Sequence, residues 1–596
     1  MNAEQLLKEY ALRALADLYK ARPDDSSMQV QKTRKEFAGD YTLVTFPLLK
    51  ISRKGPEDTA REIGDWLEAN APQVEAYNVI KGFLNVTFRG SFWAGMLGDM
   101  IGSKGYASRC ESGRTVMVEY SSPNTNKPLH LGHIRNNLLG WSVAQILEAN
   151  GDNVIKANLV NDRGIHICKS MIAWHKYGEG ETPENSGMKG DKLVGKYYVE
   201  FDKRYKAQIT ELTEAGMPKE ETERKAPVIL EAQEMLRKWE AKDPEVYKLW
   251  QTMNSWVYDG FKKTYRDMGV SFDKVYYESD TYLLGKELVQ QGLDNGVFFR
   301  KDDGSVWVDL TDEGLDQKLL LRGDGTSVYM TQDLGTAVQR FNEYKIDGLI
   351  YVVGNEQNYH FQVLKLILGK LGYGWSDHIY HLSYGMVELP AGKMKSREGT
   401  VVDADDLMEE MVETAREMSK ELGKLDELSP EEADRISTMI GMGALKYFIL
   451  KVDPRKTMLF NPAESIDFNG NTAPFIQYTH ARIKSLARRA ADQDIQPLRT
   501  IEADQTVEAK EVELVKLLLE FGEVIAEAGR QLSPALIANY VYELAKEYNQ
   551  YYHDYPILKE GVDPQSRPFR LALSLEVADV IDKGMRLLGI EVPERM

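Results

Sequence analysis

The chain has little cysteine and no long apolar run. Only two cysteines, Cys110 and Cys168, occur in 596 residues, too few for a disulfide scaffold and without the clustered partners that a zinc site needs. No apolar stretch approaches the roughly 20 residues that span a bilayer. The N-terminus also lacks the basic-then-apolar layout of a signal peptide. We therefore expect a cytoplasmic protein without a membrane partner.

An excess of basic residues is also missing. The net charge is -18, from 74 Lys and Arg residues against 92 Asp and Glu residues. This balance argues against a protein that coats nucleic acid indiscriminately. A folded RNA stays a compatible partner, because local basic patches and aromatic contacts suffice to bind it.

Apolar runs and helical stretches alternate in the middle of the chain. A strand-like run at 115–120 is followed by a Ser/Pro/Asn turn, a helix and a second run at 153–160. The same order returns later, with runs at 347–354 and 378–387 around a helix at 361–373. Two such halves predict a doubly wound, Rossmann-like α/β sheet whose ligand crevice lies at the carboxyl ends of the strands.

Accessory regions flank this α/β core. An opening helix and strand-like segments predict an α+β N-terminal domain, and the almost wholly helical sequence after Val402 predicts an all-α C-terminal domain. The expected partition is an N-terminal domain at 1–110, a Rossmann-like catalytic domain at 111–405 with a helical insertion near 177–250, a helical connection at 406–470 and a C-terminal domain at 471–596.

The first segment with a chemical signature is HLGH at 130–133. Pro128 suits a first helical turn, and His130 and His133 can lie on one face of the helix near its N-terminus. Free N–H groups and the positive end of the helix dipole favour phosphate there, and Gly132 allows a nucleotide to approach the backbone. Two histidines beside a glycine also occur as ordinary helix-start residues. The position directly after a strand and a turn favours the phosphate site.

The second segment is GKMKSREGTVV at 392–402. A glycine-flanked loop with Lys393, Lys395 and Arg397 can fold over a polyanion and stabilise a triphosphate during displacement at its α-phosphorus. A solvated basic loop is the usual interpretation of such a segment alone. Its pairing with HLGH in the other half of the same sheet indicates the opposite side of an ATP site.

Together, HLGH and KMKSR resemble the HIGH and KMSKS signatures of class I aminoacyl-tRNA synthetases, which join ATP and an amino acid into an aminoacyl-adenylate. SSPNTNKPLHLGHIR is similar to the extended first signature of the arginyl-tRNA synthetases. VNDRG at 160–164, VYMTQDLGTA at 328–337 and the closing LGIEVPERM resemble further motifs of that family in the same order, over essentially the whole chain. The resemblance implies an enzyme that activates L-arginine with ATP and transfers it to the 3′-terminal ribose of tRNA(Arg), with a first step that depends on bound tRNA.

One residue of the second signature departs from the family pattern. Ser396 occupies the position where the KMSKS loop has its second lysine, and Lys127, just before the first signature, is expected to substitute for it. The division of roles between Lys127 and the loop lysines stays open. The resemblance implies catalytic roles for Lys127, His130, His133, Lys393 and Lys395, and ATP contacts for His130, Gly132, His133, Lys393, Met394 and Ser396. No metal-ligand cluster is visible in the sequence, so we expect Mg2+ to arrive with ATP.

A site for arginine needs carboxylates and neutral acceptors that are shielded from water, because a guanidinium presents a rigid fork of donors. The resemblance implies that the amino acid is contacted by Glu119, Asn124, Tyr329, Asp333 and Gln357. Asp333 suits the guanidinium, although the pairing of each carboxylate with each nitrogen stays open. A single acidic residue is usually a solvated surface charge, so only the matched motifs distinguish these positions.

A helix at 472–490 carries aromatic and basic residues along one face. Aromatic rings that stack on unpaired bases, beside cations that hold phosphate, suit an anticodon loop, although a core helix with a basic outer face has the same pattern. The resemblance implies tRNA contacts for Phe475, Tyr478, Arg482 and Met596. The segment GFLN is similar to the part of the family that contacts the tRNA elbow, which adds Phe83 and Asn85.

Two other functions are compatible with parts of this pattern. One is another adenylate-forming enzyme with a HIGH signature, against which the helical C-terminal third and the segment with Tyr329 and Asp333 argue. The other is a noncatalytic tRNA-binding paralogue, against which the intact His130 and His133 argue, while Ser396 keeps the question open. The family is commonly monomeric, so we expect a monomer.

Overall fold

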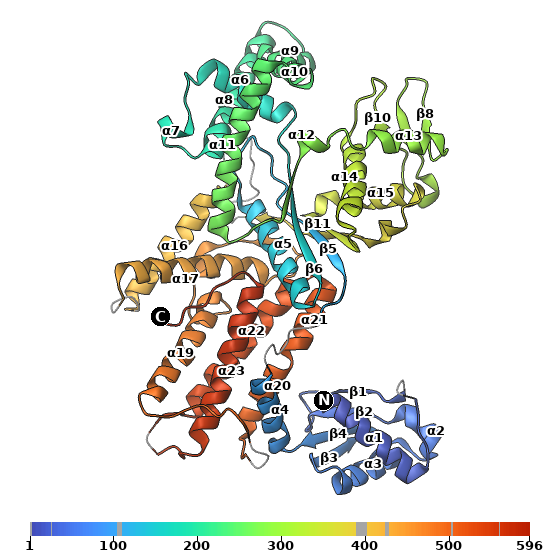
Figure 1. Cartoon of the computed structure of the whole chain (residues 1–596), viewed down its shortest axis with the longest axis vertical. Helices are drawn as coiled ribbons and strands as arrows, with labels where there is room; N and C mark the ends of the chain where they lie inside the picture. The colour runs from blue at the N-terminus through green and yellow to red at the C-terminus, as the bar shows by residue number, and fades with distance from the viewer. Residues whose placement is uncertain are drawn as a thin grey trace. The chain divides into compact units, whose positions relative to one another are not determined.

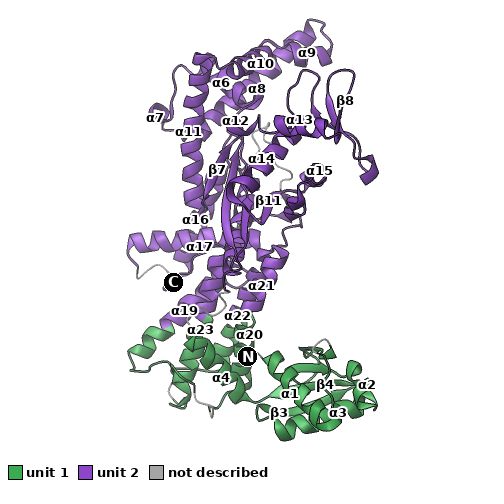
Figure 2. Cartoon of the chain, turned by 45° about the vertical axis from the view of Figure 1, so that its right-hand side comes forward, with its two compact units in different colours: residues 1–106, 486–520, 546–577 green, residues 107–485, 521–545, 578–596 purple. Residues whose placement is uncertain are grey.

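The computed structural model describes residues 3–24, 27–103, 110–388, 402–423, 428–501, 505–559 and 561–596. The chain forms two compact units (Figure 2). The first contains residues 1–106, 486–520 and 546–577, and the second contains residues 107–485, 521–545 and 578–596. Within the described residues, none of the helices combines the length and the apolarity that crossing a bilayer requires.

An antiparallel sheet and the helices α1 to α4 form the described N-terminal part of the first unit. The strands pair in the order β1-β2-β4-β3, and α3 packs its apolar face, which includes Ile63 and Leu67, against β3 and β4. Pro56 and two acidic residues in the first turn explain why α3 begins there. The bounds are α1 Ala3–Tyr19, β1 Val30–Lys32, β2 Tyr41–Val44, α2 Leu49–Ser52, α3 Pro56–Asn70, β3 Val74–Ile80, β4 Phe83–Phe88 and α4 Gly90–Gly102.

A five-stranded parallel sheet is the centre of the second unit, with the strand order β12-β11-β5-β6-β7. Its strands are β5 Thr115–Glu119, β6 Asn153–Val160, β7 Lys274–Tyr277, β11 Gly348–Gly354 and β12 Ile379–Tyr384. The chain winds outward from β5 to β7 and then returns to place β11 on the other side of β5 (Figure 1). The predicted doubly wound sheet is confirmed, and its switch point lies between β5 and β11.

Helices cover this sheet and join it to a shared apolar core. Leu334 and Phe341 of α14 Tyr329–Tyr344 and Leu364 of α15 Asn358–Lys370 pack with strand residues such as Met117 and Leu349. The other helix of the switch point is α5 Leu131–Ala149. A small antiparallel sheet, in the order β10-β9-β8, joins the same core and was not predicted from the sequence. Its strands are β8 Phe298–Arg300, β9 Val306–Val308 and β10 Lys318–Leu321, and α13 Lys286–Asp294 precedes them.

The helical insertion is longer than the expected 177–250. It runs between β6 and β7 as α6 Ile165–Tyr177, α7 Pro183–Ser186, α8 Gly190–Glu214, α9 Lys219–Lys225, α10 Pro227–Glu240 and α11 Pro244–Met268. The sequence marks α11 clearly, since Asp243 caps it and Gly269 ends it in a left-handed conformation. After β7 follows the short α12 Glu278–Thr281.

The remainder of the chain is almost wholly helical, as predicted. The helices are α16 Ala404–Glu421, α17 Pro430–Leu450, α18 Pro462–Ser465, α19 Ala473–Ala491, α20 Ala509–Leu519, α21 Phe521–Gln531, α22 Pro534–Asp554 and α23 Ser566–Leu587. One short parallel pair, β13 Val387–Glu388 with β14 Met458–Leu459, interrupts this pattern. Strand β13 follows β12 in the chain and contacts α5, so the pair lies close to the switch point.

Candidate active site

The turn after β5 is held in a conformation that non-glycine residues rarely adopt. Ser121 and Ser122 have φ values of 79° and 45°. The backbone N–H of Ser121 donates to Asn136 Oδ1, and that of Ser122 donates to Asn158 Oδ1 at 3.1 Å. Side chains from α5 and β6 therefore hold a strained turn directly after Glu119, at the switch point of the sheet.

The two histidines of HLGH form a reciprocal cap at the start of α5. His130 Nδ1 accepts from the N–H of Gly132 at 3.1 Å, and His133 Nδ1 accepts from the N–H of His130 at 3.2 Å. Burial, aided by the charge of Lys127, lowers the pKa of His130 to about 3, and burial lowers the pKa of His133 well below 6.5. From these hydrogen bonds, both rings are assigned as neutral with the proton on Nε2. Two Nε2–H donors thus lie at a helix N-terminus.

The backbone of this helix start is bonded to the chain that follows the second signature. The N–H of Leu131 donates to the carbonyl of Val402 at 3.2 Å, and the N–H of Ala404 donates to the carbonyl of Leu129 at 3.0 Å. His130 and Asp403 face each other in an antiparallel bridge between these bonds. The carboxyl flank of 389–401 is therefore fixed on the first signature.

Arg135 joins the amino flank of the same segment to α5. Its side chain is fully buried and donates to the carbonyls of Met386 at 3.3 Å, Pro454 at 3.0 Å and Lys456 at 2.7 Å. Burial lowers its pKa to about 10. The chain on both sides of 389–401 thus meets α5. Lys393, Met394, Lys395 and Ser396 lie within 389–401, outside the described residues.

Lys127 lies just before this helix and is half-buried, so that burial lowers its pKa. Helix α8 of the insertion passes close to it. A Cβ at Gly195 would lie 2.8 Å from Pro128 Cδ and 3.6 Å from Lys127 Cα. Gly195 therefore permits a close approach of the insertion to the first signature.

Glu119 has a partner that the sequence did not indicate. Its buried carboxylate forms an ion pair with the fully buried guanidinium of Arg340, which lies over the rings of Tyr276 at 4.9 Å and Tyr351 at 5.5 Å. Burial raises the pKa of Glu119, and the charge of Arg340 opposes that rise. Glu119, which was predicted to contact the substrate, thus already has a charged partner within the protein.

Asp333, in the second turn of α14, faces α15. Its Oδ2 lies 2.6 Å from His360 Nε2, and its side chain keeps 32% exposure. The charge of Asp333 raises the pKa of both Glu119 and Glu278, so the three carboxylates share one electrostatic neighbourhood. Three further predicted residues of this site are exposed, namely Asn124, Tyr329 and Gln357. The backbone of Asn124 pairs with that of Asn161.

Glu278 was not identified from the sequence. It follows β7 directly at the carboxyl edge of the sheet and is almost completely buried. Burial raises its pKa to about 7, while the charge of Arg163 opposes the rise and those of Asp162 and Asp333 add to it. Arg163 Nη1 lies 3.8 Å from Glu278 Oε1. A carboxylate at the end of a parallel strand is a typical site residue in this fold. Glu278 could be identified in this way only if β7 were first recognised as a strand.

The predicted tRNA-contacting residues of α19 lie on one side of that helix. Phe475, Tyr478 and Arg482 are partly exposed, whereas the helix turns Ile476 and Ile483 into the core. Arg482 lies over the ring of Tyr478 at 4.8 Å. This arrangement presents two aromatic rings and a cation along one helix face.

The C-terminal segment that ends at Met596 follows the same helix. The carbonyl of Glu591 accepts from Gln477 Nε2 at 2.8 Å, and the carbonyl of Pro593 lies 2.9 Å from His480 Nδ1. These two bonds attach the last residues of the chain to α19.

Phe83 and Asn85 lie on the same strand but differ in exposure. Phe83 is 36% exposed and packs edge-on against Phe46. Asn85 is buried, accepts from Thr42 Oγ1 at 2.6 Å and donates to Asn78 Oδ1 at 2.9 Å. Phe83 is accessible, whereas Asn85 bonds within the sheet that presents it.

Comparisons with known proteins cover nearly the whole chain. Three family models match: the arginyl tRNA synthetase N terminal domain at residues 5–88, the catalytic domain of tRNA synthetases class I (R) at 98–461, and the DALR anticodon binding domain at 476–596. Arginine–tRNA ligases from Bacteroides thetaiotaomicron and Flavobacterium psychrophilum are 62% and 55% identical to the chain, each over 100% of both sequences.

Solved structures agree with the fold. The arginyl-tRNA synthetase of Thermus thermophilus superposes with a TM-score of 0.77 at 26% identity, over 100% of both chains. That of Plasmodium falciparum superposes with a TM-score of 0.75 at 18% identity, over 100% of this chain and 99% of the other.

The histidine cap predicts a specific protonation state. Since burial holds the pKa of His130 at about 3 and that of His133 well below 6.5, both rings should stay neutral and protonated at Nε2 down to about pH 5. Long-range proton–nitrogen NMR on histidine-labelled protein measures this, with His130→Asn and His133→Asn to assign the signals. A ring that titrates near neutral pH, or one protonated at Nδ1, would contradict the assigned cap.

Proposed function

The chain belongs to the class I arginyl-tRNA synthetases, and on that premise we propose that it activates L-arginine with ATP and attaches the arginyl group to the 3′-terminal ribose of tRNA(Arg). The first turn of α5 supports this function most directly. Two neutral Nε2–H donors lie there at a helix N-terminus, and the same turn is bonded to the carboxyl flank of the second signature.

In the first step, a carboxylate oxygen of arginine attacks the α-phosphorus of ATP. An oxygen–phosphorus bond forms while the bond to the bridging oxygen of the β-phosphate breaks, so that pyrophosphate leaves and arginyl-adenylate remains. His130 and His133 donate from Nε2–H to phosphate oxygens as their negative charge grows. Because both rings are neutral, they stabilise this charge without transferring a proton. Gly132 leaves the helix start open to the nucleotide.

Cations complete the phosphate site in this proposal. Lys127 supplies the charge that Ser396 does not. Since burial lowers the pKa of Lys127, its ammonium group is poorly solvated before a phosphate is bound and gains much from that phosphate. Lys393 and Lys395 also act on the triphosphate, and Met394 and Ser396 contact the nucleotide. Mg2+ would reach this site bound to ATP and would supply charge neutralisation for the leaving pyrophosphate.

In the second step, a terminal ribose hydroxyl of tRNA, first the 2′-hydroxyl, attacks the carbonyl carbon of the adenylate. An ester forms and AMP leaves with release of a proton. Positioning and charge stabilisation account for most of the rate. We also propose that bound tRNA is required before arginine is activated.

Arginine is recognised by carboxylates at the switch point. We propose that Asp333 and Glu278 bind the guanidinium, in a bidentate arrangement that suits its fork of donors. Glu119, whose charge is balanced by Arg340, binds the amino-acid end together with Asn124 and Gln357. Tyr329 closes the site with its exposed ring.

The tRNA contacts are proposed for both units separately. Phe475 and Tyr478 stack on unpaired anticodon bases, Arg482 holds a phosphate, and Met596 contributes from the attached C-terminal segment. In the N-terminal sheet, Phe83 contacts the tRNA elbow, and Asn85 holds the strand that presents it.

The expected domains follow from these roles. We propose the N-terminal domain at 1–110 for the elbow, the catalytic domain at 111–405, the connection at 406–470 and the anticodon-binding domain at 471–596. We further propose that the enzyme is a cytoplasmic monomer.

Exchange of labelled pyrophosphate into ATP tests the function. The purified protein should catalyse exchange that requires both arginine and tRNA(Arg), and His133→Ala should reduce it by about a hundredfold or more, as when one donor to a developing charge is removed. Arginine binding should change little in that variant. Absence of exchange with tRNA(Arg) present, while tRNA still binds, would favour the noncatalytic tRNA-binding function.

The pKa of Glu278 predicts a pH dependence of arginine binding. Since that pKa is raised to about 7, Glu278 is mostly protonated at pH 6 and mostly ionised at pH 8, and only the carboxylate attracts a guanidinium. Arginine affinity, measured by calorimetry with tRNA(Arg) present, should increase up to about tenfold between these values. Glu278→Gln should weaken binding and remove the dependence.

His360→Asn is the matched control, because it removes the partner of Asp333 in the same site and leaves Glu278 unchanged. The dependence should persist in His360→Asn. If His360→Asn abolishes the pH dependence of arginine binding while Glu278→Gln retains it, the imidazole and not Glu278 is the source of that dependence.

A further inference from the structure

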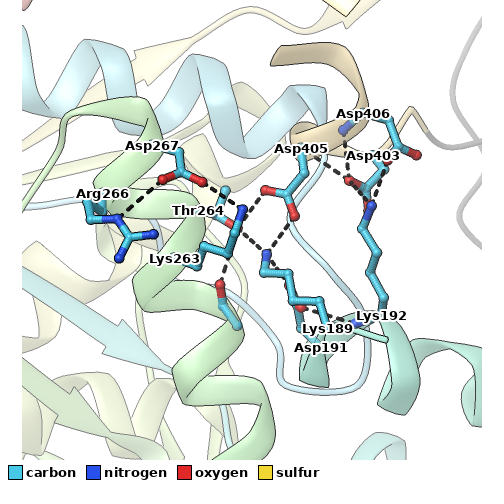
Figure 3. Close-up of polar contacts among 11 residues, drawn as sticks. Lys189, Asp191, Lys192, Lys263, Thr264, Arg266, Asp267, Asp403, Asp405 and Asp406 are labelled. Atoms are coloured by element: carbon cyan, nitrogen blue, oxygen red, sulfur yellow. Dashed lines mark hydrogen bonds and ion pairs between the residues drawn. The ribbon is translucent and has the colours of Figure 1, made fainter. Parts of the chain in front are cut away.

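A cluster of charged side chains and one threonine connects the helical insertion to the start of α16. It consists of Lys189, Asp191 and Lys192 at the start of α8, Thr264 on α11, and Asp403, Asp405 and Asp406 at the start of α16. Figure 3 shows the two lysines pointing toward the carboxylates of α16. Lys189 Nζ lies 2.6 Å from Asp405 Oδ2, and Lys192 Nζ lies 2.6 Å from Asp406 Oδ1 and 3.3 Å from Asp403 Oδ1.

The inner half of this cluster is shielded from water. The side chains of Lys189 and Asp405 keep 15% and 17% exposure, and that of Asp191 keeps none. Lys189 Nζ also lies 3.1 Å from Asp191 Oδ2 and donates to Thr264 Oγ1, which in turn donates to Asp405 Oδ1 at 2.9 Å. Removing one partner would leave a buried charge uncompensated, so the cluster holds α8, α11 and α16 in one geometry.

The cluster ends at residues that belong to the proposed phosphate site. Asp403 Oδ1 accepts from the N–H groups of Asp405 at 2.9 Å and Asp406 at 3.2 Å, and so caps α16. The backbone of Asp403 pairs with His130, and Ala404 bonds to Leu129. The first turn of α16 therefore carries one strand of the bridge that fixes the histidine cap.

Helix α8 touches the other strand of this bridge independently. Gly195 lies against Pro128 and Lys127. A side chain at this position would clash, because its Cβ would lie 2.8 Å from Pro128 Cδ. One helix of the insertion thus contacts both chain segments that meet at His130. A displacement of α8 would move Lys127, Asp403 and the cap together.

We propose that Lys189 is a positioning residue for adenylate formation. Through Asp405 it fixes the first turn of α16, and through the pairing of Asp403 with His130 it sets where the two Nε2–H donors point. The expected effect of Lys189 on the reaction rate rests on the proposed function. The positioning role assigns the contact between α8 and α16 to the ATP side of the reaction.

The test compares Lys189→Met and Asp405→Asn with Lys262→Met in the full chain with tRNA(Arg). The first two variants should reduce kcat for arginine-dependent pyrophosphate exchange or raise KM for ATP by about tenfold to a hundredfold, the effect of a misplacement of about 1 Å. KM for arginine should change less than twofold. Lys189→Arg should restore most of the loss.

Lys262 is the matched control, because it lies on α11 in an exposed pair with Asp259 and outside the cluster. Lys262→Met should leave all parameters unchanged. An unchanged kcat and KM for ATP in Lys189→Met, or an equal loss for ATP and arginine that follows a lowered melting temperature, would overturn the positioning role.

A second readout does not depend on activity. In Lys189→Met and Asp405→Asn, the ring nitrogen signals of His130 and His133 should shift, while that of the exposed His378 should not. Unshifted signals would overturn the proposal even if the wild-type enzyme were inactive. Shifted signals in a protein that shows no exchange would support the effect of Lys189 on the histidine cap and would reject the proposed function.

Discussion

The first turns of helix α5, which carry the histidine cap, are fixed by groups from distant parts of the chain. Arg135 is a fully buried cation whose hydrogen bonds go to three backbone carbonyls, Met386, Pro454 and Lys456. Leu131 and His130 pair with Val402 and Asp403 on the other side. The chain before and after 389–401 is therefore anchored on one helix start. This constraint brings both flanks of 389–401 to the first signature, although they are far from it in sequence.

Charge balance at the carboxyl edge of the sheet explains how an arginine site can be built from three neighbouring carboxylates. Two of them lie beside guanidinium groups of the protein, Glu119 beside Arg340 and Glu278 beside Arg163. Asp333 is instead bonded to His360 and is the most exposed of the three. A bound arginine can replace a histidine more easily than a buried guanidinium, which favours Asp333 as the primary contact.

Much of this arrangement was predictable from local sequence. The apolar runs before SSPN and before GNEQ predicted two halves of one parallel sheet, and HLGH predicted a helix start, because each feature depends on residues close together in the chain. Glu278 and Arg340 were missed because their roles depend on long-range packing. Glu278 becomes part of the site only after the insertion returns the chain to β7. Arg340 is an ordinary helix residue until α14 packs against β5. The short strands β8 to β10 were missed because runs of three or four residues carry little periodicity.

In the proposed reaction the triphosphate of ATP lies against the two Nε2–H groups at the start of α5. Paramagnetic broadening by Mn2+ bound with ATP in place of Mg2+ measures this in protein labelled at histidine. We expect the Nε2 signals of His130 and His133 to broaden beyond detection, while the signal of His378, at the amino edge of the sheet before β12, persists. Persistence of both signals from α5 under saturating ATP and Mn2+ would show that the triphosphate does not lie there.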